Sequence, residues 1–533
     1  MRRVVNWSLV FWAGLGLIML LRVFYFGFTY FNYLDDNNTY GIFFRRNADI
    51  WNEIILWYRL YTFRPIAFFA DAYITQWFWP RMEFVLLFYT LMNFITLLLF
   101  KDVLKKSGIS FGVTGLIICA LVPLNIEAVY WIGASTRFVP GMFFSVLSCY
   151  MLVNFLEKEH RGRNSALFLY FLFNLISTGF YEQIIVFNFA FTLIIVALNF
   201  RRLGYDKALI TAVPFISSFI IGGYYLFFMS TSERLAGRAT LVSEGFVTHF
   251  TATTGSIVRL LTTHNFNMLQ TGFLGFWAAP LNIARVVILL LVLLFALTCG
   301  FALLSEEAEA DEPLIKIIIG LILALAPFAP FFILENNFMA FRNVYPSIFG
   351  IAIVVDAVAE LVLKFRFMRP VSGLLISAVC LIFFLSSVSE INNYRLIEID
   401  DHIIANNFLE EFRHTGFDES GPIIVFNTRH RFSETSREGF ENISSSDWAF
   451  LGKLNANTDE FYFLNILPVV AEFTSFPQDR LNDEPLLMGM SDDMSFVRLN
   501  LGVRGNRLYC ERGLPFGRLI SDGDRYTFEA FGS

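Results

Sequence analysis

Apolar stretches of about 18 or more residues recur along the first three-quarters of this 533-residue chain. A stretch of that length crosses the hydrocarbon core of a bilayer as one helix, because about 20 residues at helical rise span it. Charged residues make up 16% of the chain, against about 25% in average soluble domains. The sequence therefore predicts a mainly helical, polytopic membrane protein. The net charge of −6 gives no indication of nucleic-acid binding.

A hydropathy window of about 19 residues predicts about eleven spans in this chain. They cover 7–28, 82–100, 111–132, 139–156, 166–180, 183–199, 207–229, 284–304, 314–334, 344–363 and 371–389. The first has a basic head and an apolar body, but Arg22 interrupts it and no A-x-A pattern follows. We therefore expect a retained anchor rather than a cleaved signal peptide.

The composition changes after residue 390, where the chain becomes polar and charged. Residues 1–390 are predicted to form the membrane domain, and residues 391–533 a small α/β domain. The stretch DHIIANNFLEEFRHTG has apolar residues at helical spacing, whereas PIIVF and SFVRLNLGVRGNRLYCERG are typical of strands.

Lysine and arginine in short loops predict the orientation of the chain. The basic connections are KDVLKKSGIS, EKEHRGRNS, NFRRLGYDK and LKFRFMRP. All four lie on one side if the N-terminus is cytoplasmic. With an odd number of spans, the C-terminal domain is then extracytoplasmic.

The motif YLDD at residues 33–36 opens a long loop, 29–81, on the predicted outer side. Apolar and aromatic residues recur in this loop at helical spacing, which favours interfacial helices on the membrane surface. A second outer loop, about 230–283, has a similar amphipathic character. The adjacent carboxylates Asp35 and Asp36 would thus face the outer side, unless Asp36 simply caps a turn.

Ionisable and aromatic residues gather in the short outer connections. Charges at membrane depth are costly and tend to mark sites or pathways, although a single one is more often a snorkelling anchor. A single aromatic residue more often belongs to the interfacial belt. The residues concerned are Arg64 in the first loop, Glu127, Trp131 and Arg137 in NIEAVYWIGASTRF, Tyr181, Glu182 and Gln183 in GFYEQIIVF, and Arg342 and Tyr345 in FRNVYP.

Several site types lack their motifs in this sequence. It contains no paired cysteine ligands, H-E-x-x-H motif, P-loop or G-x-S-x-G elbow. Asn37 in NNT and Asn442 in NIS match the N-glycosylation acceptor pattern.

The layout resembles that of the GT-C membrane glycosyltransferases, and within them the multi-span enzymes related to protein mannosyltransferases. The resemblance covers residues 1–390 and depends on YLDD at 33–36, YRLYTFRPI at 58–66, PLNIEAVYWIGASTR at 123–137, FYEQ at 180–183 and FRNVYP at 341–346. No single motif is specific, but their order and sidedness match the family plan.

The resemblance implies a sugar transferase in a bacterial plasma (inner) membrane that uses a polyprenyl-phosphate sugar donor. The acidic residue of the family's first outer loop acts at the sugar-transfer site and corresponds to Asp36 or Asp35. A carboxylate can take the acceptor's proton, and arginine can bind the leaving lipid phosphate. Arg342, Arg64 and Arg137 are the candidates, in that order. Some members need a divalent metal, so the metal is left open.

The substrate would also contact Glu127, Trp131, Tyr181, Glu182, Gln183 and Tyr345. The acceptor is an envelope glycan, lipid or protein, which the sequence does not distinguish. Two other functions fit many spans: a transporter or flippase for a lipid-linked glycan, and an envelope-glycan polymerase. Pro123, Pro214 and Pro327 interrupt spans and keep the transporter open.

Overall fold

The computed structural model describes residues 7–37, 39, 64–79, 81–157, 163–200, 207–229, 242, 244–278, 282–305, 313–335, 339–417, 421–428, 441–458, 462, 464–470, 474–502, 507–510, 513–522 and 524–531. The chain divides into two compact units. The first comprises Met1–Tyr30 and Trp51–Ile391, and the second comprises Phe31–Ile50 and Asn392–Ser533.

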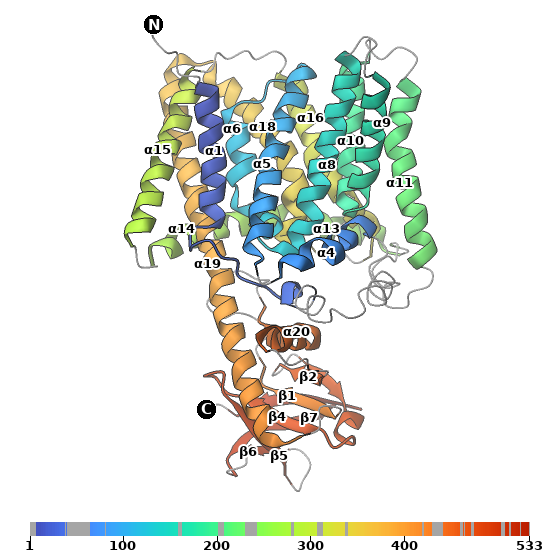
Figure 1. The fold of residues 1–533 in the computed structure, drawn as a ribbon, viewed down its shortest axis with the longest axis vertical. Coiled ribbons are helices and arrows are strands. Elements are labelled where there is room, and N and C mark those ends of the chain that lie inside the picture. Colours follow the sequence, from blue (N-terminus) through green and yellow to red (C-terminus); the bar gives the residue numbers. More distant parts are fainter. Residues whose placement is uncertain are drawn as a thin grey trace. The chain divides into compact units, whose positions relative to one another are not determined.

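The first unit is a bundle of helices that run side by side (Figure 1). Its long helices are α1 (Trp7–Val23), α5 (Glu83–Lys106), α8 (Ile132–Glu157), α9 (Arg163–Thr178), α10 (Glu182–Leu198), α11 (Lys207–Met229), α15 (Ile283–Ser305), α16 (Pro313–Leu325), α18 (Tyr345–Leu363) and α19 (Arg369–Thr415). Each predicted span overlaps helical residues. Among the described residues, six helical segments are long and apolar enough to cross a membrane. A mainly helical bundle with candidate membrane spans is therefore confirmed, whereas its place in a membrane and the number of spans stay predictions.

Proline breaks two of the predicted spans into shorter pieces. The third predicted span becomes α6 (Val113–Leu121), the 3-10 turn η3 (Pro123–Asn125) and α7 (Ile126–Val129). The ninth becomes α16, η6 (Ala326–Phe328) and α17 (Ala329–Ile333). Proline cannot donate the backbone hydrogen bond that would continue the helix. The predicted interruptions at Pro123 and Pro327 are therefore confirmed, whereas Pro214 lies inside α11 without breaking it.

Helices also lie across one end of the bundle. Figure 1 shows α4 (Pro65–Tyr73) there, with α13 (Phe246–Arg259) and α14 (Asn265–Ala278) at the same end. The short elements beside them are η2 (Thr75–Phe78), the π-helical η5 (Leu260–His264) and η7 (Phe341–Val344), while η8 (Arg366–Met368) precedes α19. The prediction of helices within 29–81 and 230–283 is confirmed for these residues, whereas their place on the outer side stays a prediction. Residues 40–63 of the first loop lie outside the described part. We call this end of the bundle the crosswise end.

Helices α16 and α18 cross with almost no side chain between them. A Cβ atom added to Gly350 would lie 2.1 Å from the backbone nitrogen of Ala324 and 2.5 Å from the carbonyl oxygen of Gly320. Atoms do not approach so closely, and backbone cannot move aside as a flexible side chain can. Glycine at position 350 therefore fixes the closest approach of these two helices.

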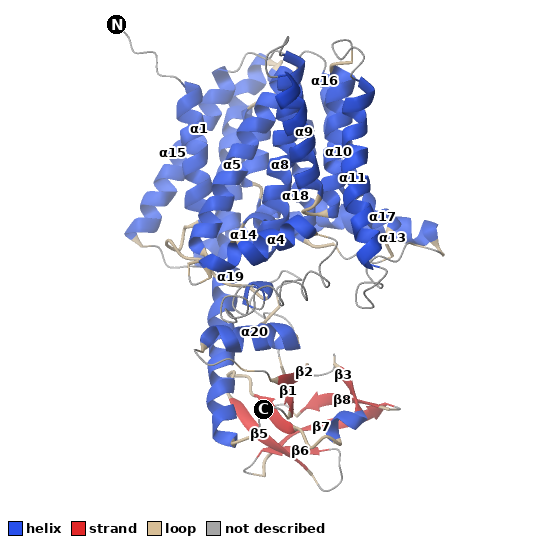
Figure 2. Ribbon diagram, turned by 45° about the vertical axis from the view of Figure 1, so that its right-hand side comes forward, coloured by secondary structure: helices blue, strands red, loops and turns tan. Residues whose placement is uncertain are grey.

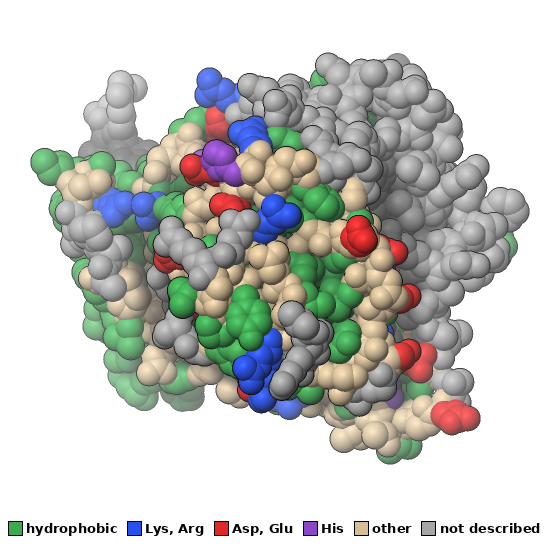
Figure 3. Space-filling model, turned by 90° about the horizontal axis from the view of Figure 1, so that it is seen from below, with side chains coloured by type: hydrophobic (Ala, Val, Ile, Leu, Met, Phe, Trp, Pro, Cys, Tyr) green, Lys and Arg blue, Asp and Glu red, His purple; other side chains and the backbone are tan. Residues whose placement is uncertain are grey.

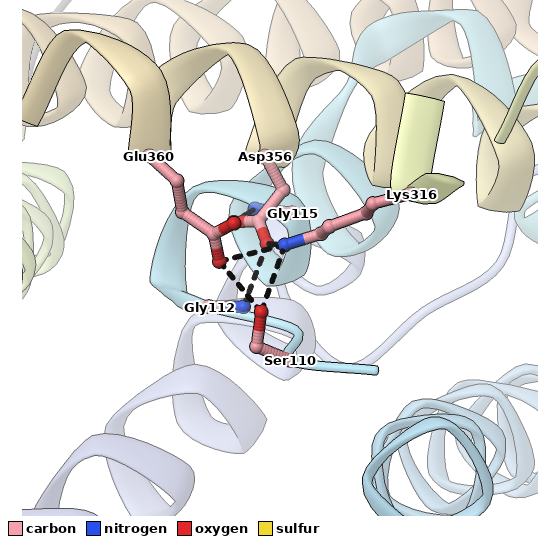
Figure 4. A network of polar contacts seen from close by, with 6 residues as sticks. All are labelled: Ser110, Gly112, Gly115, Lys316, Asp356 and Glu360. Atoms are coloured by element: carbon pink, nitrogen blue, oxygen red, sulfur yellow. Dashed lines mark hydrogen bonds and ion pairs between the residues drawn. The ribbon is translucent and has the colours of Figure 1, made fainter. Parts of the chain in front are cut away.

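A buried ion network lies further along α18 (Figure 4). Lys316 Nζ is 2.6 Å from Asp356 Oδ2 and 2.7 Å from Glu360 Oε1, and Lys316 and Asp356 are 4% and 2% exposed. Asp356 also accepts the backbone N–H groups of Gly112 and Gly115 at 2.9 and 3.0 Å. These donors belong to the start of α6, where helix N–H groups lack partners within the helix. One carboxylate thus joins α16, α18 and α6.

The second unit combines the end of α19 with a mixed sheet and α20 (Asp447–Asn457); Figure 2 separates its strands from its helices by colour. The strand order is β2-β1-β4-β5-β6-β7-β8-β3, with β1 parallel to β2 and β4 and the other pairs antiparallel. The strands are β1 (Pro422–Phe426), β2 (Asn465–Val469), β3 (Ser475–Pro477), β4 (Leu486–Met490), β5 (Phe496–Leu501), β6 (Arg507–Cys510), β7 (Pro515–Asp522) and β8 (Arg525–Ala530), and η9 (Ile443–Ser445) and η10 (Gln478–Leu481) are 3-10 turns.

One apolar core holds the sheet of the second unit together. It contains Ile424, Phe426, Val469, Phe476, Leu487, Leu499, Leu508, Leu519 and Phe528. On the helical side, the Phe408 ring of α19 lies 5.0 Å from Phe450 of α20 and 5.4 Å from Phe496 of β5. The predicted helix after residue 401 and the predicted strands are confirmed. The helix is the continuation of the last predicted span rather than a separate element.

The described surface seen in Figure 3 carries acidic and basic side chains scattered among apolar and neutral polar ones. Both asparagines of the glycosylation patterns, Asn37 and Asn442, are fully buried. A glycosylation enzyme would therefore not reach them in the folded chain.

Candidate functional site

An arginine–glutamate pair ties α4 to the joint between α9 and α10. Arg64 precedes α4, and Glu182 occupies the first turn of α10. The guanidinium donates from Nε to Glu182 Oε1 and from the second terminal nitrogen to Oε2, both at 3.2 Å. It also lies 4.0 Å from the ring centroid of Tyr181. The two side chains are 20% and 32% exposed, so this bidentate pair remains open to solvent.

Local packing explains why Arg64 reaches Glu182. The backbone N–H of Ile66 donates to the carbonyl of Gly179 at 3.1 Å, next to the α9–α10 joint. A Cβ atom on Gly179 would lie 2.3 Å from the Ile66 side chain. Ala67 and Ala70 of α4 pack against Phe180 at the same joint. Small residues thus let α4 approach closely enough for the ion pair.

A second arginine–glutamate pair lies at the end of α6 and the start of α18. Arg342 on η7 pairs with Glu127 on α7, and its guanidinium carbon lies 5.0 Å from the ring centroid of Trp131. The side chains of Arg342 and Glu127 are 26% and 10% exposed. The break at Pro123 turns the chain so that Glu127 stands on a short helix facing η7. This pair therefore repeats the arrangement of the first: arginine, glutamate and an aromatic face.

Asn343 connects the two pairs. Its side-chain nitrogen donates to the Tyr181 hydroxyl at 3.2 Å and to Gln183 Oε1 at 3.0 Å. Gln183 in turn donates to the carbonyls of Asn343 and Pro327, at 2.9 and 3.0 Å. Residues from four separate chain segments thus form one polar group, which we call the arginine-pair site. Its members are Arg64, Glu127, Trp131, Tyr181, Glu182, Gln183, Arg342 and Asn343.

The third predicted phosphate-binding arginine has a carboxylate neighbour that sequence reasoning missed. Arg137 lies within α8 rather than in a connecting loop, because α8 begins at Ile132. Its guanidinium lies 3.8 Å from Asp71 of α4, and these side chains are 16% and 5% exposed. Asp71 lies in the aromatic sequence FFADAY, where it is the one charged residue. No motif around it indicated a functional role.

Two predicted substrate contacts are buried in the bundle. Tyr345 is completely buried and donates from its hydroxyl to Asn93 of α5 at 2.8 Å. Gln183 is 1% exposed. Both residues hold the helices that carry the arginine pairs, and a direct contact with a substrate stays a prediction for each.

The Asp35–Asp36 pair belongs to the second unit, whereas the arginine pairs belong to the first. Asp36 is completely buried, and one carboxylate oxygen accepts the backbone N–H of Tyr33 at 3.0 Å. Asp36 therefore caps the turn that begins at Tyr33, which is the alternative that the sequence left open. Leu34 has a φ of 34°, which is strained for a residue with a branched side chain. Strain of this kind often accompanies functional sites, so a catalytic role for the pair stays a prediction.

Asp401 is a second buried carboxylate of this unit, outside the apolar part of α19. Its Oδ1 accepts from the backbone N–H of Ile443 at 3.0 Å and from the side chain of Asn442 at 3.3 Å, while Oδ2 has no hydrogen-bond partner. Burial raises the pKa of Asp401 to about 7, although Lys453 and these hydrogen bonds act to lower it. No pattern in the sequence around Asp401 indicated that this carboxylate would be buried.

No cluster of three or more histidine, cysteine, aspartate or glutamate side chains suited to a metal is found in the described residues. The arrangement offers paired cations, carboxylates and aromatic faces. These groups can bind a phosphate, hold a hydroxyl and stack on a sugar. No protein-family model matches the chain, and no curated protein matches it.

Proposed function

We propose that this protein is a GT-C type membrane glycosyltransferase. It moves a sugar from a polyprenyl-phosphate donor to a glycan, lipid or protein acceptor on the extracytoplasmic face of a plasma membrane. The observation that carries the proposal is the convergence of two arginine–glutamate–aromatic groups at the crosswise end, linked by Asn343. The donor's phosphate would lie at the membrane boundary, where a charge costs much less free energy than inside the bilayer.

The partial exposure of these pairs supports binding rather than a purely structural role. Ion pairs that remain solvated contribute little to stability, about 0–1 kcal/mol. The donor's phosphodiester carries one negative charge, as a carboxylate does, and the leaving polyprenyl phosphate gains a second; both match the planar guanidinium fork. Arg64 can therefore exchange the partly exposed Glu182 for the donor phosphate, while Arg342 keeps the buried Glu127 and offers its exposed N–H groups. Trp131 and Tyr181 then lie beside the sugar. Asp36 or Asp35 stays the candidate base that the resemblance implies.

A sugar-transfer assay tests this function. Membranes containing the intact protein receive labelled polyprenyl-phosphate sugars, and transfer is compared with that of Arg64→Gln and Arg342→Gln. Each change removes a cation from the developing phosphate charge, so we expect transfer to fall by about 100-fold or more, with donor accumulating. Arg81→Gln is the matched control, because Arg81 also pairs with a glutamate, Glu83, but is 75% exposed. Unchanged transfer in both test variants would refute the proposal.

The base is tested in the same assay with Asp36→Asn and Asp35→Asn, each checked for normal expression. Loss of transfer in one variant identifies the base. Full transfer in both removes the pair from the chemistry.

One observation favours the transporter instead. The network of Lys316, Asp356 and Glu360 puts charges inside the bundle, and α6 and α16 are both interrupted. Transporters combine these two features. Passage of a lipid-linked glycan across vesicles containing the protein, without sugar transfer, would favour this function.

A further inference from the structure

Among the residues that the structure describes, Arg22 is a buried cation without a carboxylate partner. It lies in the last turn of α1, at the end of an otherwise apolar helix, and is 1% exposed. Its hydrogen bond is made by one terminal nitrogen to the side-chain oxygen of Asn125, at 3.3 Å. Its Nε is buried without a hydrogen-bond partner. A neutral amide is thus the acceptor for a guanidinium that has five N–H donors.

An arrangement of this kind is costly. A guanidinium stays charged under physiological conditions, and a buried charge without a counter-ion costs several kcal/mol. Arginine inside a membrane-type bundle is rare and usually marks a binding site or a pathway. A methionine or leucine would fill the position without this cost.

Three other arginines at the crosswise end differ from Arg22 in this respect. Arg64 pairs with Glu182, Arg342 pairs with Glu127, and Arg137 lies near Asp71. An incoming anion must compete with a carboxylate at each of these three. At Arg22 it competes, among the described residues, with the amide of Asn125, so Arg22 is the one of these four best able to gain a counter-ion.

Polar side chains from three other elements are connected to Arg22, directly or through one another. Asn125 belongs to η3, Tyr345 opens α18, and Asn93 lies on α5. Tyr345 is within electrostatic reach of Arg22 and donates to Asn93 at 2.8 Å. Asn125 donates to the carbonyl of Cys119 at 3.1 Å. We call Arg22, Asn93, Asn125 and Tyr345 the Arg22 cluster.

The Arg22 cluster adjoins the arginine-pair site along the chain. Asn125 precedes Glu127 by two positions, and Tyr345 follows Arg342 by three. Asn125 stands on the short turn between α6 and α7, not within a long helix. A shift of that turn would release Arg22 and move Glu127 with it.

We propose that Arg22 binds the phosphate group of a polyprenyl-phosphate lipid. The identity of the lipid rests on the proposed function, whereas the need for an anion rests on Arg22 itself. The guanidinium donates two parallel hydrogen bonds to two phosphate oxygens, and Asn125 releases the arginine as the lipid binds. Arg22 thereby adds a buried contact to the lipid phosphate that Arg64 and Arg342 contact from the exposed part of the site.

The test measures binding to the full-length protein in detergent. The probes are a long-chain polyprenyl phosphate, the corresponding polyprenol and inorganic phosphate. We expect Arg22→Met to weaken binding of the polyprenyl phosphate by about 10- to 100-fold, because a charged hydrogen bond contributes about 1.5–3 kcal/mol. Arg22→Lys should retain part of the affinity, and Arg81→Met should bind like wild type. Polyprenol binding should not change in any variant.

Three results would overturn the proposal. One is wild-type affinity for the polyprenyl phosphate in Arg22→Met. Another is equal binding of polyprenol and polyprenyl phosphate by the wild type. Inorganic phosphate that binds as tightly as the lipid would also overturn the assignment to a lipid.

Stability without lipid distinguishes a binding role from a structural one. Removal of an uncompensated buried charge should leave Arg22→Met at least as stable as wild type. A structural arginine would instead give clear losses of thermal stability in both Arg22→Met and Arg22→Lys, and that result counts against the proposal.

Asn125→Asp provides an independent variant. It gives Arg22 a carboxylate partner and should weaken lipid-phosphate binding without altering Arg22. Unchanged binding in a folded Asn125→Asp protein would contradict the proposal. Because no sugar is transferred in these experiments, lipid binding that depends on Arg22 can survive even if the transfer assay fails, and transfer can survive if Arg22 proves unimportant.

Discussion

The ion pairs at the two ends of α18 differ in how deeply they are buried. Near its start, Arg342 pairs with Glu127 while keeping about a quarter of its side-chain surface exposed. Three turns further along, Lys316 and Asp356 form a pair that is almost completely buried and is completed by backbone N–H groups. The arginine of the first pair can therefore be reached by an incoming anion. The ammonium group of the second cannot be reached without breaking the buried network.

The difference shows which charges of a membrane-type bundle are available for function. A buried network with all donors and acceptors satisfied fixes the positions of the helices that it joins. Partly exposed pairs contribute little to folding and can be used for recognition. We therefore expect substitutions at the two ends to separate stability from activity.

The largest effect on stability should come from Lys316→Met. This change leaves Asp356 and Glu360 buried without their cation, so we expect a loss of about 3–5 kcal/mol in the free energy of unfolding. Thermal or denaturant unfolding in detergent measures it. Lys106→Met is the matched control, because Lys106 also lies between two carboxylates, at 3.4 and 3.3 Å, but these are more than 40% exposed. Equal losses in both variants would remove the distinction between the two ends.

Asp401 tests what burial does to a carboxylate without a bonded ammonium group. Its pKa is raised to about 7 in the folded chain from an ordinary value of 3.8. Between these pH values the unfolded chain has lost the proton while the folded chain keeps it. The stability contributed by this proton is complete below about pH 4 and is lost as the pH rises to about 7.

Asp401→Asn should therefore gain stability relative to wild type as the pH rises from about 4 to 7, and the gain should then level off. At about 1.4 kcal/mol for each pKa unit, it reaches at most a few kcal/mol. Unfolding measured across this range tests the prediction. Asp447→Asn, at the exposed start of α20, controls for the loss of one surface carboxylate. A difference that does not depend on pH would show that Asp401 does not titrate as expected.

The smallest effect is expected for Ser110→Ala at the edge of the buried network. Ser110 donates to Glu360 at 2.9 Å and accepts from Lys316 at 3.4 Å. Both partners keep other contacts, so the loss should be about 1 kcal/mol. Unfolding under the same conditions as for Lys316→Met measures it. A loss as large as that of Lys316→Met would mean that the hydroxyl, not the ammonium group, organises the network.

The sequence could predict those parts of the fold that depend on residues close together in the chain. Long apolar stretches predicted the helices. Lysine and arginine in the connecting loops predicted which side each loop faces, and so predicted that Arg64, Glu127, Glu182 and Arg342 lie on the same side. The structure brings these four into one site. The interruptions at Pro123 and Pro327 had a local signal as well, because proline cannot continue the backbone hydrogen bonds of a helix. The same signal misled at Pro214, since α11 continues through it.

The parts that escaped prediction depend on long-range packing. Tyr33 lies 5.3 Å from Tyr394, ring to ring, and its hydroxyl accepts the backbone N–H of Glu441. These contacts place the Asp35–Asp36 segment in the second unit, although the sequence assigned it to the first domain. The pairing of Arg137 with Asp71 and the lack of a carboxylate beside Arg22 likewise depend on residues far apart in the chain. No spacing rule connects them.

The crossing at Gly350 gives α18 a mechanical property. The helix is in direct backbone contact with α16 at a point between Arg342 and Asp356. The close packing extends along the helix, since a Cβ atom on Gly320 would lie 2.9 Å from the backbone nitrogen of Val354. Backbones packed this closely cannot shift independently, so a ligand that displaces Arg342 would move α16 and α18 together, with the ion network of Lys316.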